Sequence, residues 1–319
     1  MCNDSLVKLS VVVPCYNEED VVPQLYDEVL RETDQVVEEW ELILVDDGSA
    51  DDTIGQCRKL AASDERVRYI SLSRNFGKES ALLAGLHAAT GDAVILMDAD
   101  LQHPPQLIPE LVTMYRAGHD QVVTRRSRAG DPPLRRLVSR GYYGVVNRLM
   151  DVRIEDGTGD FRLLSRRAVD ALLSMPEQNR FSKGLFAWIG FAGPTVHYVD
   201  ASRTSGSSRW SMRQLLDYGV DGVVAFNVKP LRMLVWTGLT VLALSLAYIG
   251  VVIIAVIVRG VDAPGYVTLI TAVLGLGGLQ LVGLGVLGEY VGRIYLEVKQ
   301  RPHYLVRDSN VERPARKDR

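Results

Sequence analysis

Residues 93–104, AVILMDADLQHP, place two carboxylates directly after an apolar strand. Apolar side chains run up to Met97, as in a buried strand, and Asp98 and Asp100 follow at once. In open α/β sheets, ligands bind at the carboxyl ends of the strands, because helices cover both faces of the sheet. Two neighbouring carboxylates repel each other unless a cation lies beside them. The stretch therefore predicts an acidic strand end that binds a cation.

Apolar strands and helices alternate along the N-terminal part of the chain. The expected strands cover residues 8–14, 40–49, 66–73, 92–97 and 120–126. The expected helices cover residues 18–37, 51–63, 77–90 and 104–118. Strands that alternate with helices imply crossover connections and a mostly parallel, twisted sheet. The predicted fold class is α/β, with a doubly wound, nucleotide-binding architecture.

Composition excludes several classes of protein. The net charge of -3 over 319 residues argues against a general nucleic-acid binder. The three cysteines have no metal-like spacing and fit a reducing compartment. The N-terminal residues lack the apolar core of a signal peptide. No glycine-rich dinucleotide fingerprint, P-loop or serine elbow is present, so a nucleotide-linked dehydrogenase is not expected.

Two uncharged segments near the C-terminus, 233–258 and 263–288, contain no Asp, Glu, Lys or Arg. Each is longer than the roughly 20 residues with which a helix crosses a bilayer, and the link between them is short. Lysines and arginines flank the pair on both outer sides, whereas the link carries only Arg259. By the positive-inside rule we expect a membrane hairpin with both flanks in the cytoplasm. The alternative is a pair of buried core helices.

The residues before the first uncharged segment, 211–226, have an apolar face and a face with Arg213, Asp217 and Asp221. Such a helix can lie along a membrane surface. Packing on the sheet is the alternative, because aspartates are poorly suited to that surface. The glycines of GLGGLQLVGLG, 275–285, favour close helix packing, including packing between subunits of a homo-oligomer.

Four further polar stretches are candidate binding segments. They are PCYNEED at 14–20, VDDGSADDT at 45–53, TRRSRAGDPPLRRLVSR at 124–140 and RTSGSSRWS at 203–211. The first two each have a plain structural alternative, a helix N-terminus and a turn respectively. Arginines of the third suit phosphate oxygens, or anionic lipid at a membrane surface. The fourth is typical of a mobile loop, here with two phosphate-binding charges, Arg203 and Arg209.

The ordered set of motifs resembles the membrane-bound polyprenyl-phosphate glycosyltransferases of glycosyltransferase family 2. Beyond the stretches quoted above, it includes SRNFGKESALLAGLHAATGD and GTGDFRLLSR. The likeness covers about 8–307, and the two C-terminal segments bring it closer to the bactoprenol glucosyltransferases than to dolichol-phosphate mannose synthase. It implies a GT-A catalytic domain over 1–210, an interface helix over 211–230, two transmembrane helices over 231–290 and a basic cytoplasmic tail over 291–319.

The resemblance also assigns roles to residues. The residues that it implies for nucleotide-sugar binding are Pro14, Tyr16, Glu18, Asp46, Asp47, Asp98 and Arg209. The residues that it implies for metal binding are Asp98, Asp100 and Gln102. Lipid-phosphate binding falls to Arg125, Arg135 and Ser139, although doubled arginines leave that register open by one residue. The reacting centre is expected to include Asp98, Asp100, Asp160 and Arg203. The family usually has lysine where Arg209 stands, and GSSRW lacks the glutamine of the processive synthases.

The implied reaction moves a sugar, with glucose on UDP as the first candidate, to a polyprenyl phosphate at the membrane, with inversion. A phosphate monoester has its second pKa near 6, so its oxygen is already a nucleophile at neutral pH. Catalysis then needs Mg²⁺ or Mn²⁺ for the leaving group and a clamp for two anions. Two alternatives stay open: another acceptor, with the spans as a mere anchor, or a non-catalytic partner that only binds nucleotide sugar or lipid.

Overall fold

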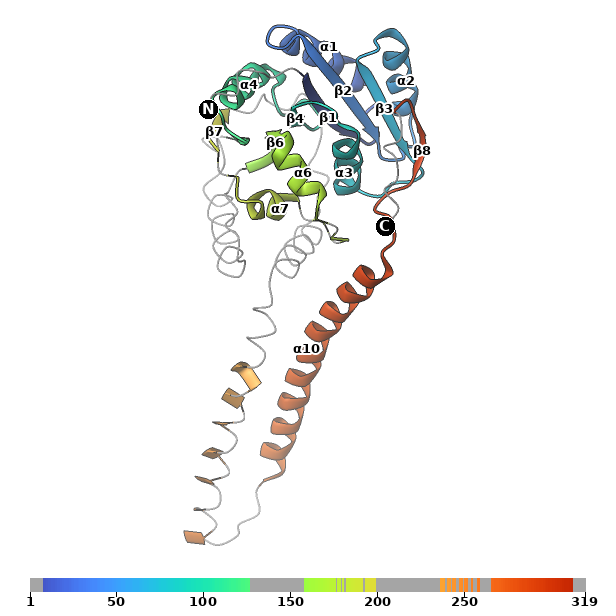
Figure 1. Ribbon diagram of the computed structural model, residues 1–319. Helices are drawn as coiled ribbons and strands as arrows, with labels where there is room; N and C mark the ends of the chain where they lie inside the picture. The colour runs from blue at the N-terminus through green and yellow to red at the C-terminus, as the bar shows by residue number, and fades with distance from the viewer. Residues whose placement is uncertain are drawn as a thin grey trace.

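The computed structural model of the 319-residue chain describes residues 8–126, 158–198 except 176, 179, 181 and 192, selected residues between 236 and 258, and 265–311. Within these residues, eight strands form one sheet in the order β7-β5-β6-β4-β1-β2-β3-β8 (Figure 1). The strands are β1 (Lys8–Cys15), β2 (Glu39–Asp46), β3 (Val67–Leu72), β4 (Ala93–Leu96), β5 (Gln121–Arg126), β6 (Thr158–Ser165), β7 (Thr195–Tyr198) and β8 (Val306–Ser309).

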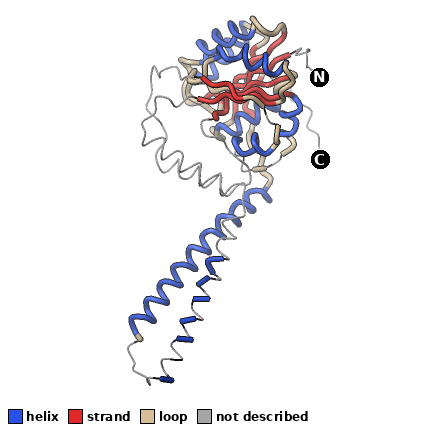
Figure 2. The backbone as a smooth tube through the Cα atoms, turned by 90° about the vertical axis from the view of Figure 1, so that its left-hand side faces the viewer, coloured by secondary structure: helices blue, strands red, loops and turns tan. Residues whose placement is uncertain are grey.

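Helices cover both faces of the sheet, which lies between them in Figure 2. The helices are α1 (Val22–Thr33), α2 (Thr53–Ser63), α3 (Lys78–Ala88), α4 (Ile108–Arg116), α6 (Arg166–Leu173), α7 (Ser182–Trp188) and α10 (Tyr266–Lys299), with a 3₁₀ turn η1 (Pro105–Leu107) before α4. One apolar core joins the sheet to α1, α2 and α4, and another joins it to α3, α6 and α7. The expected α/β architecture is confirmed.

Strand β4 shows why these apolar runs form central strands. Ala93 and Ile95 pack into the core beneath α1 and α4, and Val94 and Leu96 into the core beneath α3. Successive side chains of a strand point to opposite faces, so a strand covered on both faces needs an unbroken apolar run. The same alternation continues past the strand, with Met97 in the core on the α1 side. Asp98 is therefore expected on the α3 side.

The order of the central strands differs from a simple doubly wound sheet. Strands β3, β2, β1 and β4 are mutually parallel, as expected. Strand β6 then lies between β4 and β5 and runs antiparallel to both. It inserts next to β4 although the chain passes through β5 first. The sheet is thus mixed at this side, and the acidic end of β4 acquires an antiparallel neighbour.

The C-terminal region differs from the basic tail expected over 291–319. Helix α10 continues to Lys299, and β8 pairs antiparallel with β3 at the edge of the sheet. Arg58 on α2 binds Asp308 on β8 at 2.7 Å, and Tyr69 on β3 donates a hydrogen bond to the same carboxylate at 3.1 Å. The chain therefore returns to the sheet after α10 and covers its edge strand.

Helix α10 is 34 residues long and carries exposed apolar side chains such as Leu281, Leu284 and Leu287. Across the parts of the chain that the structure describes, no helix meets the combined length and apolarity of a membrane span. The amphipathic segment at 211–226 lies outside the described residues.

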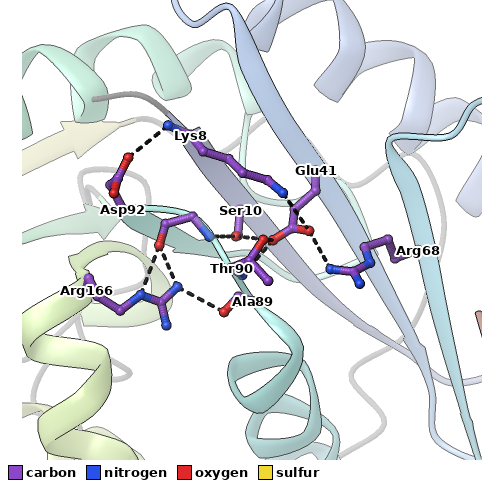
Figure 3. A network of polar contacts seen from close by, with 9 residues as sticks. Lys8, Ser10, Glu41, Arg68, Ala89, Thr90, Asp92 and Arg166 are labelled. Carbon is purple, nitrogen blue, oxygen red and sulfur yellow. Dashed lines mark hydrogen bonds and ion pairs between the residues drawn. The ribbon is translucent and has the colours of Figure 1, made fainter. Parts of the chain in front are cut away.

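A buried carboxylate ties the strands together at the end of the sheet opposite the acidic strand end (Figure 3). Glu41 on β2 accepts hydrogen bonds from Ser10 Oγ at 2.6 Å and from Thr90 N at 2.7 Å. Arg68 Nη1 lies 2.8 Å from its other oxygen, and Lys8 Nζ lies 3.4 Å away. Burial alone would raise the pKa of Glu41, but these hydrogen bonds lower it from 4.5 to about 2.

We predict that Glu41→Gln lowers the apparent Tm of the full-length protein by about 3–5 °C, since a lowered carboxyl pKa of this size corresponds to about 2–3 kcal/mol. Because the folded pKa is depressed, this contribution is complete above pH 4.5 and is lost as the pH falls toward 2. Tryptophan fluorescence during heating at pH 7 and pH 4 measures it. The exposed neighbour Glu39→Gln is the control, and an equal effect of both variants would contradict the assignment.

Candidate active site

A pocket of about 330 Å³ opens at the carboxyl ends of β1, β2 and β4, beside the start of α3. Its lining comprises Pro14, Cys15, Tyr16, Glu18, Asp47, Asn75, Gly77, Lys78, Asp98, Ala99 and Asp100. Six residues singled out from the sequence thus meet in one place: Pro14, Tyr16, Glu18, Asp47, Asp98 and Asp100. They meet because parallel strands that share a sheet end at the same edge.

Asp160 reaches the same place from a different direction. The antiparallel ladder of β4 and β6 pairs Val94 with Leu164 and Leu96 with Arg162. Continued by two residues, the same register sets Asp98 opposite Asp160. Like charges directly opposite each other destabilise a pair of strands. The sheet therefore holds two carboxylates close together. A cation is needed beside them to offset their repulsion.

Lys78 supplies that cation from the first turn of α3. Its Nζ lies 2.6 Å from Asp98 Oδ1 and 2.6 Å from Asp160 Oδ2. Burial lowers the pKa of Lys78, but the charges of the two aspartates raise it well above its ordinary value. The Lys78 side chain is still 43% exposed, so the ammonium faces the pocket as well as the carboxylates. We call Asp98, Lys78 and Asp160 the charge bridge.

Both aspartates of the charge bridge stay ionised. Burial raises the pKa of Asp98, but hydrogen bonding to His103 and the charge of Lys78 outweigh burial and lower that pKa far below its ordinary value. Burial likewise opposes ionisation of Asp160, and Lys78 again lowers its pKa. Neither group is suited to accept a proton at neutral pH.

His103 supports Asp98 from the side away from Lys78. Its Nε2 lies 3.6 Å from Asp98 Oδ2, and its Nδ1 shares a hydrogen bond of 2.6 Å with the hydroxyl of Tyr198 on β7. The ring packs 5.4 Å from that of Phe161, between centroids. A Cβ on Gly159 would lie 3.2 Å from the His103 ring, so glycine leaves room for this arrangement. Neither His103 nor Lys78 was predicted as a site residue from the sequence, although both lie within the quoted motifs.

The second residue of the acidic motif is placed differently. Asp100 is exposed, and its Oδ1 accepts a hydrogen bond of 3.1 Å from the backbone N–H of Gln102. Leu101 between them has φ of 54°, a left-handed conformation that closes a tight turn. The turn presents the Asp100 carboxylate at the pocket, whereas Gln102 is not among the residues that line it.

The oxygen donors of Asp98 and Asp100 fit a divalent cation such as Mg²⁺ or Mn²⁺. Among the described residues, no three acidic, histidine or cysteine side chains converge as the ligands of one ion. Mg²⁺ is commonly held by one or two carboxylates together with substrate phosphates, and two aspartates suffice for that arrangement. One of them, Asp98, forms an ion pair with Lys78.

Asp46 and Asp47, at the end of β2, shape the pocket through the backbone. Asp46 accepts hydrogen bonds from Ser49 N at 3.0 Å and from Ser71 Oγ at 2.9 Å. Asp47 accepts them from the backbone N–H groups of Phe76 at 2.8 Å and Gly77 at 2.9 Å. Burial raises the pKa of Asp47, and the two backbone hydrogen bonds oppose the rise. The contacts of Asp46 are those of a residue that stabilises a turn, and Asp46 is not among the residues that line the pocket.

The loop after β1 is fastened to the loop after β2 in the same manner. Asn17 N donates to Ser49 Oγ at 3.0 Å, and Ala50 N donates to Asn17 Oδ1 at 2.9 Å. Glu18 N donates to Thr53 Oγ1 at 2.9 Å. Tyr16 is 42% exposed at the pocket, so its ring presents a surface on which a base can stack.

The remaining predicted residues do not join this pocket within the described part of the chain. Arg125 lies on β5, where it pairs in register with Thr158 and His197, and it does not line the pocket. Arg135, Ser139, Arg203 and Arg209 lie outside the described residues.

We predict that Asp47→Asn weakens the hydrogen bonding that holds the loop before Lys78 in place. An amide has one acceptor oxygen where the carboxylate has two, so it cannot receive both backbone N–H groups in the same geometry. Hydrogen exchange should show faster exchange at Phe76 and Gly77, by about tenfold for a lost bond of roughly 1.4 kcal/mol. Asp52→Asn, in the neighbouring loop, is the control, and unchanged protection in Asp47→Asn would contradict this role.

Comparison with known proteins gives the family. The family model described as Glycosyl transferase family 2 matches residues 10–173, and the model described as GtrB C-terminal hairpin matches 229–294. CsbB of Bacillus subtilis (strain 168), which is named as a putative glycosyltransferase, is 50% identical over 95% of this chain and 92% of its own length. The SfII prophage-derived bactoprenol glucosyl transferase of Shigella flexneri is 42% identical over 97% of this chain and 100% of its own.

Among solved structures, glucosyl-3-phosphoglycerate synthase from Mycobacterium tuberculosis shares 22% identity, with a TM-score of 0.47 over 68% of this chain and 76% of that one. That likeness is too distant to bear on the function of the present chain. The family model and the full-length relatives suffice: this chain belongs to glycosyltransferase family 2 and is a glycosyltransferase.

Proposed function

We propose that this glycosyltransferase moves a sugar, with glucose as the first candidate, from a UDP-linked donor to a polyprenyl phosphate at the cytoplasmic face of a membrane. The observation that carries the proposal is the pocket at the strand ends, which Tyr16 and Glu18 line together with Asp98 and Asp100. The relatives named as bactoprenol glucosyl transferases support the choice of sugar and acceptor.

Different residues of the pocket account for different parts of the donor. Tyr16 offers its ring to the base, and Glu18 offers a carboxylate to ring nitrogen or ribose hydroxyl groups. Asp98 and Asp100 would hold a divalent cation, which supplies charge neutralisation to the departing diphosphate. Gly77 stands at the pocket with φ of 95°, a conformation in which a side chain would be strained. Its missing side chain also leaves the backbone open to a close approach by the donor.

The proposed acceptor does not require a general base. A phosphate oxygen is already anionic at neutral pH and attacks the anomeric carbon directly, which displaces the nucleoside diphosphate with inversion. Asp160, whose pKa is lowered, remains ionised and does not take a proton. We assign it an orienting role through Lys78, from which it is 2.6 Å away. Arg125, Arg135 and Ser139 are the proposed clamp for the lipid phosphate.

The membrane location rests on the C-terminal segments. Residues 263–288 are uncharged, and the GtrB C-terminal hairpin model spans 229–294. Apolar side chains along α10 are exposed, for example Leu269 at 66% and Leu281 at 70%. A membrane hairpin at this place would hold the pocket next to a phosphate that stays in the bilayer. We also propose that the catalytic domain and both termini face the cytoplasm, and that the glycine-rich spans pack between subunits.

We predict that the full-length protein in detergent, given undecaprenyl phosphate, Mg²⁺ or Mn²⁺ and radiolabelled UDP-glucose, moves label into the organic phase. Asp100→Ala should reduce the transfer at least about 100-fold, because it removes a ligand of the leaving-group cation. Chelation should have the same effect. Glu39→Gln, which alters an exposed carboxylate at the opposite edge, is the matched control.

The same assay separates the alternatives. Label that enters a soluble or protein product instead of lipid would favour another acceptor. Absence of transfer from any of a panel of nucleotide sugars, beside an active control enzyme, would contradict the proposal. In inside-out membrane vesicles the added donor should label the lipid without detergent, whereas sealed right-side-out vesicles should stay unlabelled; the reverse pattern would overturn the proposed orientation.

A further inference from the structure

The charge bridge places a protein cation on the carboxylate that the proposed function gives to a metal ion. Lys78 Nζ lies 2.6 Å from Asp98 Oδ1, and Asp98 Oδ2 faces His103 at 3.6 Å. We propose that Lys78 competes with the divalent cation for Asp98, so that the cation binds well only together with the donor diphosphate, which then receives the Lys78 ammonium. This inference rests on the proposed function and adds a positioning residue to it.

The first support is that Lys78 can change partners without a change in the fold. Its side chain is 43% exposed and lines the pocket, while its backbone is at the start of α3. The preceding residues Phe76 and Gly77 are fixed by Asp47, so the helix start stays in place. A lysine ammonium is a point charge on a flexible four-carbon chain. Rotation about its side-chain bonds is sufficient to carry it from the carboxylates to an anion in the pocket.

The second support is the balance of charge. Lys78 offsets two carboxylates that the register of β4 and β6 holds opposite each other. A divalent cation that approaches Asp98 meets this ammonium beside the same oxygen and is repelled by it. A diphosphate brings further negative charge to the pocket and gives Lys78 a new partner. Cation and diphosphate should therefore assist each other's binding beyond their own direct contact.

The third support is the difference between the two aspartates. Asp100 is exposed and free of any ion pair in the described residues, whereas Asp98 is bound by Lys78. Of these two aspartates, only Asp98 must be released before it can serve as a metal ligand. The opposing interpretation is a purely structural ion pair, in which Lys78 stays on the carboxylates in all states and metal affinity does not depend on it.

The test is equilibrium dialysis of the full-length protein in detergent against ⁵⁴Mn²⁺, with UDP, GDP, inorganic phosphate or no anion on both sides of the membrane. Wild-type protein should bind Mn²⁺ weakly alone, and UDP or GDP should strengthen binding about tenfold or more, within the usual range of coupling between two ligands. Lys78→Met should bind Mn²⁺ about tenfold more tightly than wild type without nucleotide, and the nucleotide should strengthen its binding less than in wild type, because only the direct contact between cation and diphosphate remains.

Further variants make the outcome specific. Lys78→Arg keeps the charge and should retain weak binding in the absence of nucleotide. Lys59→Met removes a lysine from the exposed surface of α2 and should behave as wild type. The circular dichroism spectrum and apparent Tm of Lys78→Met are recorded alongside, and Lys78→Gln serves as a second neutral variant.

Unchanged or weaker Mn²⁺ binding by both Lys78→Met and Lys78→Gln would overturn the inference. The inference would also be overturned if the nucleotide strengthened Mn²⁺ binding equally in wild type and in the variants. The same holds if inorganic phosphate strengthened Mn²⁺ binding as much as UDP does. The proposed metal site fails separately if Asp100→Ala binds Mn²⁺ as wild type does in the presence of UDP. Activity need not be measured for any of these outcomes.

Discussion

The site depends on one constraint, the opposition of two carboxylates across neighbouring antiparallel strands. Because β6 inserts beside β4, the ladder that pairs Leu96 with Arg162 brings Asp98 and Asp160 to the same edge of the sheet. Lys78, which comes from α3 on that face, lies 2.6 Å from each and offsets their repulsion. The sheet holds two carboxylates close together, and the flexible Lys78 side chain neutralises them. The same ammonium is within reach of an anionic ligand in the pocket.

Two sets of contacts fix the loop that leads to Lys78. Buried Asp47 fixes the backbone at Phe76 and Gly77, so Lys78 starts from a defined point. Leu305, which directly precedes β8, binds the beginning of the same loop, since Ser73 N donates to Leu305 O at 2.8 Å. Helix α10 ends at Lys299, only a few residues before this contact. The C-terminal helix and the loop that leads to Lys78 are thus joined through one short segment.

The sequence was sufficient for the features that follow from parallel strands. Apolar runs that end in polar residues predicted the strand ends of β1, β2 and β4, and the family resemblance assigned Tyr16, Asp47 and Asp98 to one nucleotide-sugar site. It was insufficient where the outcome depends on long-range pairing. The place of β6 between β4 and β5, and the return of β8 to β3, are set by tertiary packing that no local pattern encodes. Lys78 was not predicted as a site residue, because its contacts with Asp98 and Asp160 are likewise made between distant parts of the sequence.

The most direct test of the charge bridge is a double-mutant cycle of thermal stability with Lys78→Met, Asp160→Asn and the two combined. If Lys78 offsets the repulsion of two opposed carboxylates, its replacement should lower the apparent Tm in the wild-type background. The loss should largely disappear once Asp160 is neutral, a coupling of about 1 kcal/mol or more. Additive losses, equal in both backgrounds, would show that Lys78 and Asp160 act independently and would contradict the central claim.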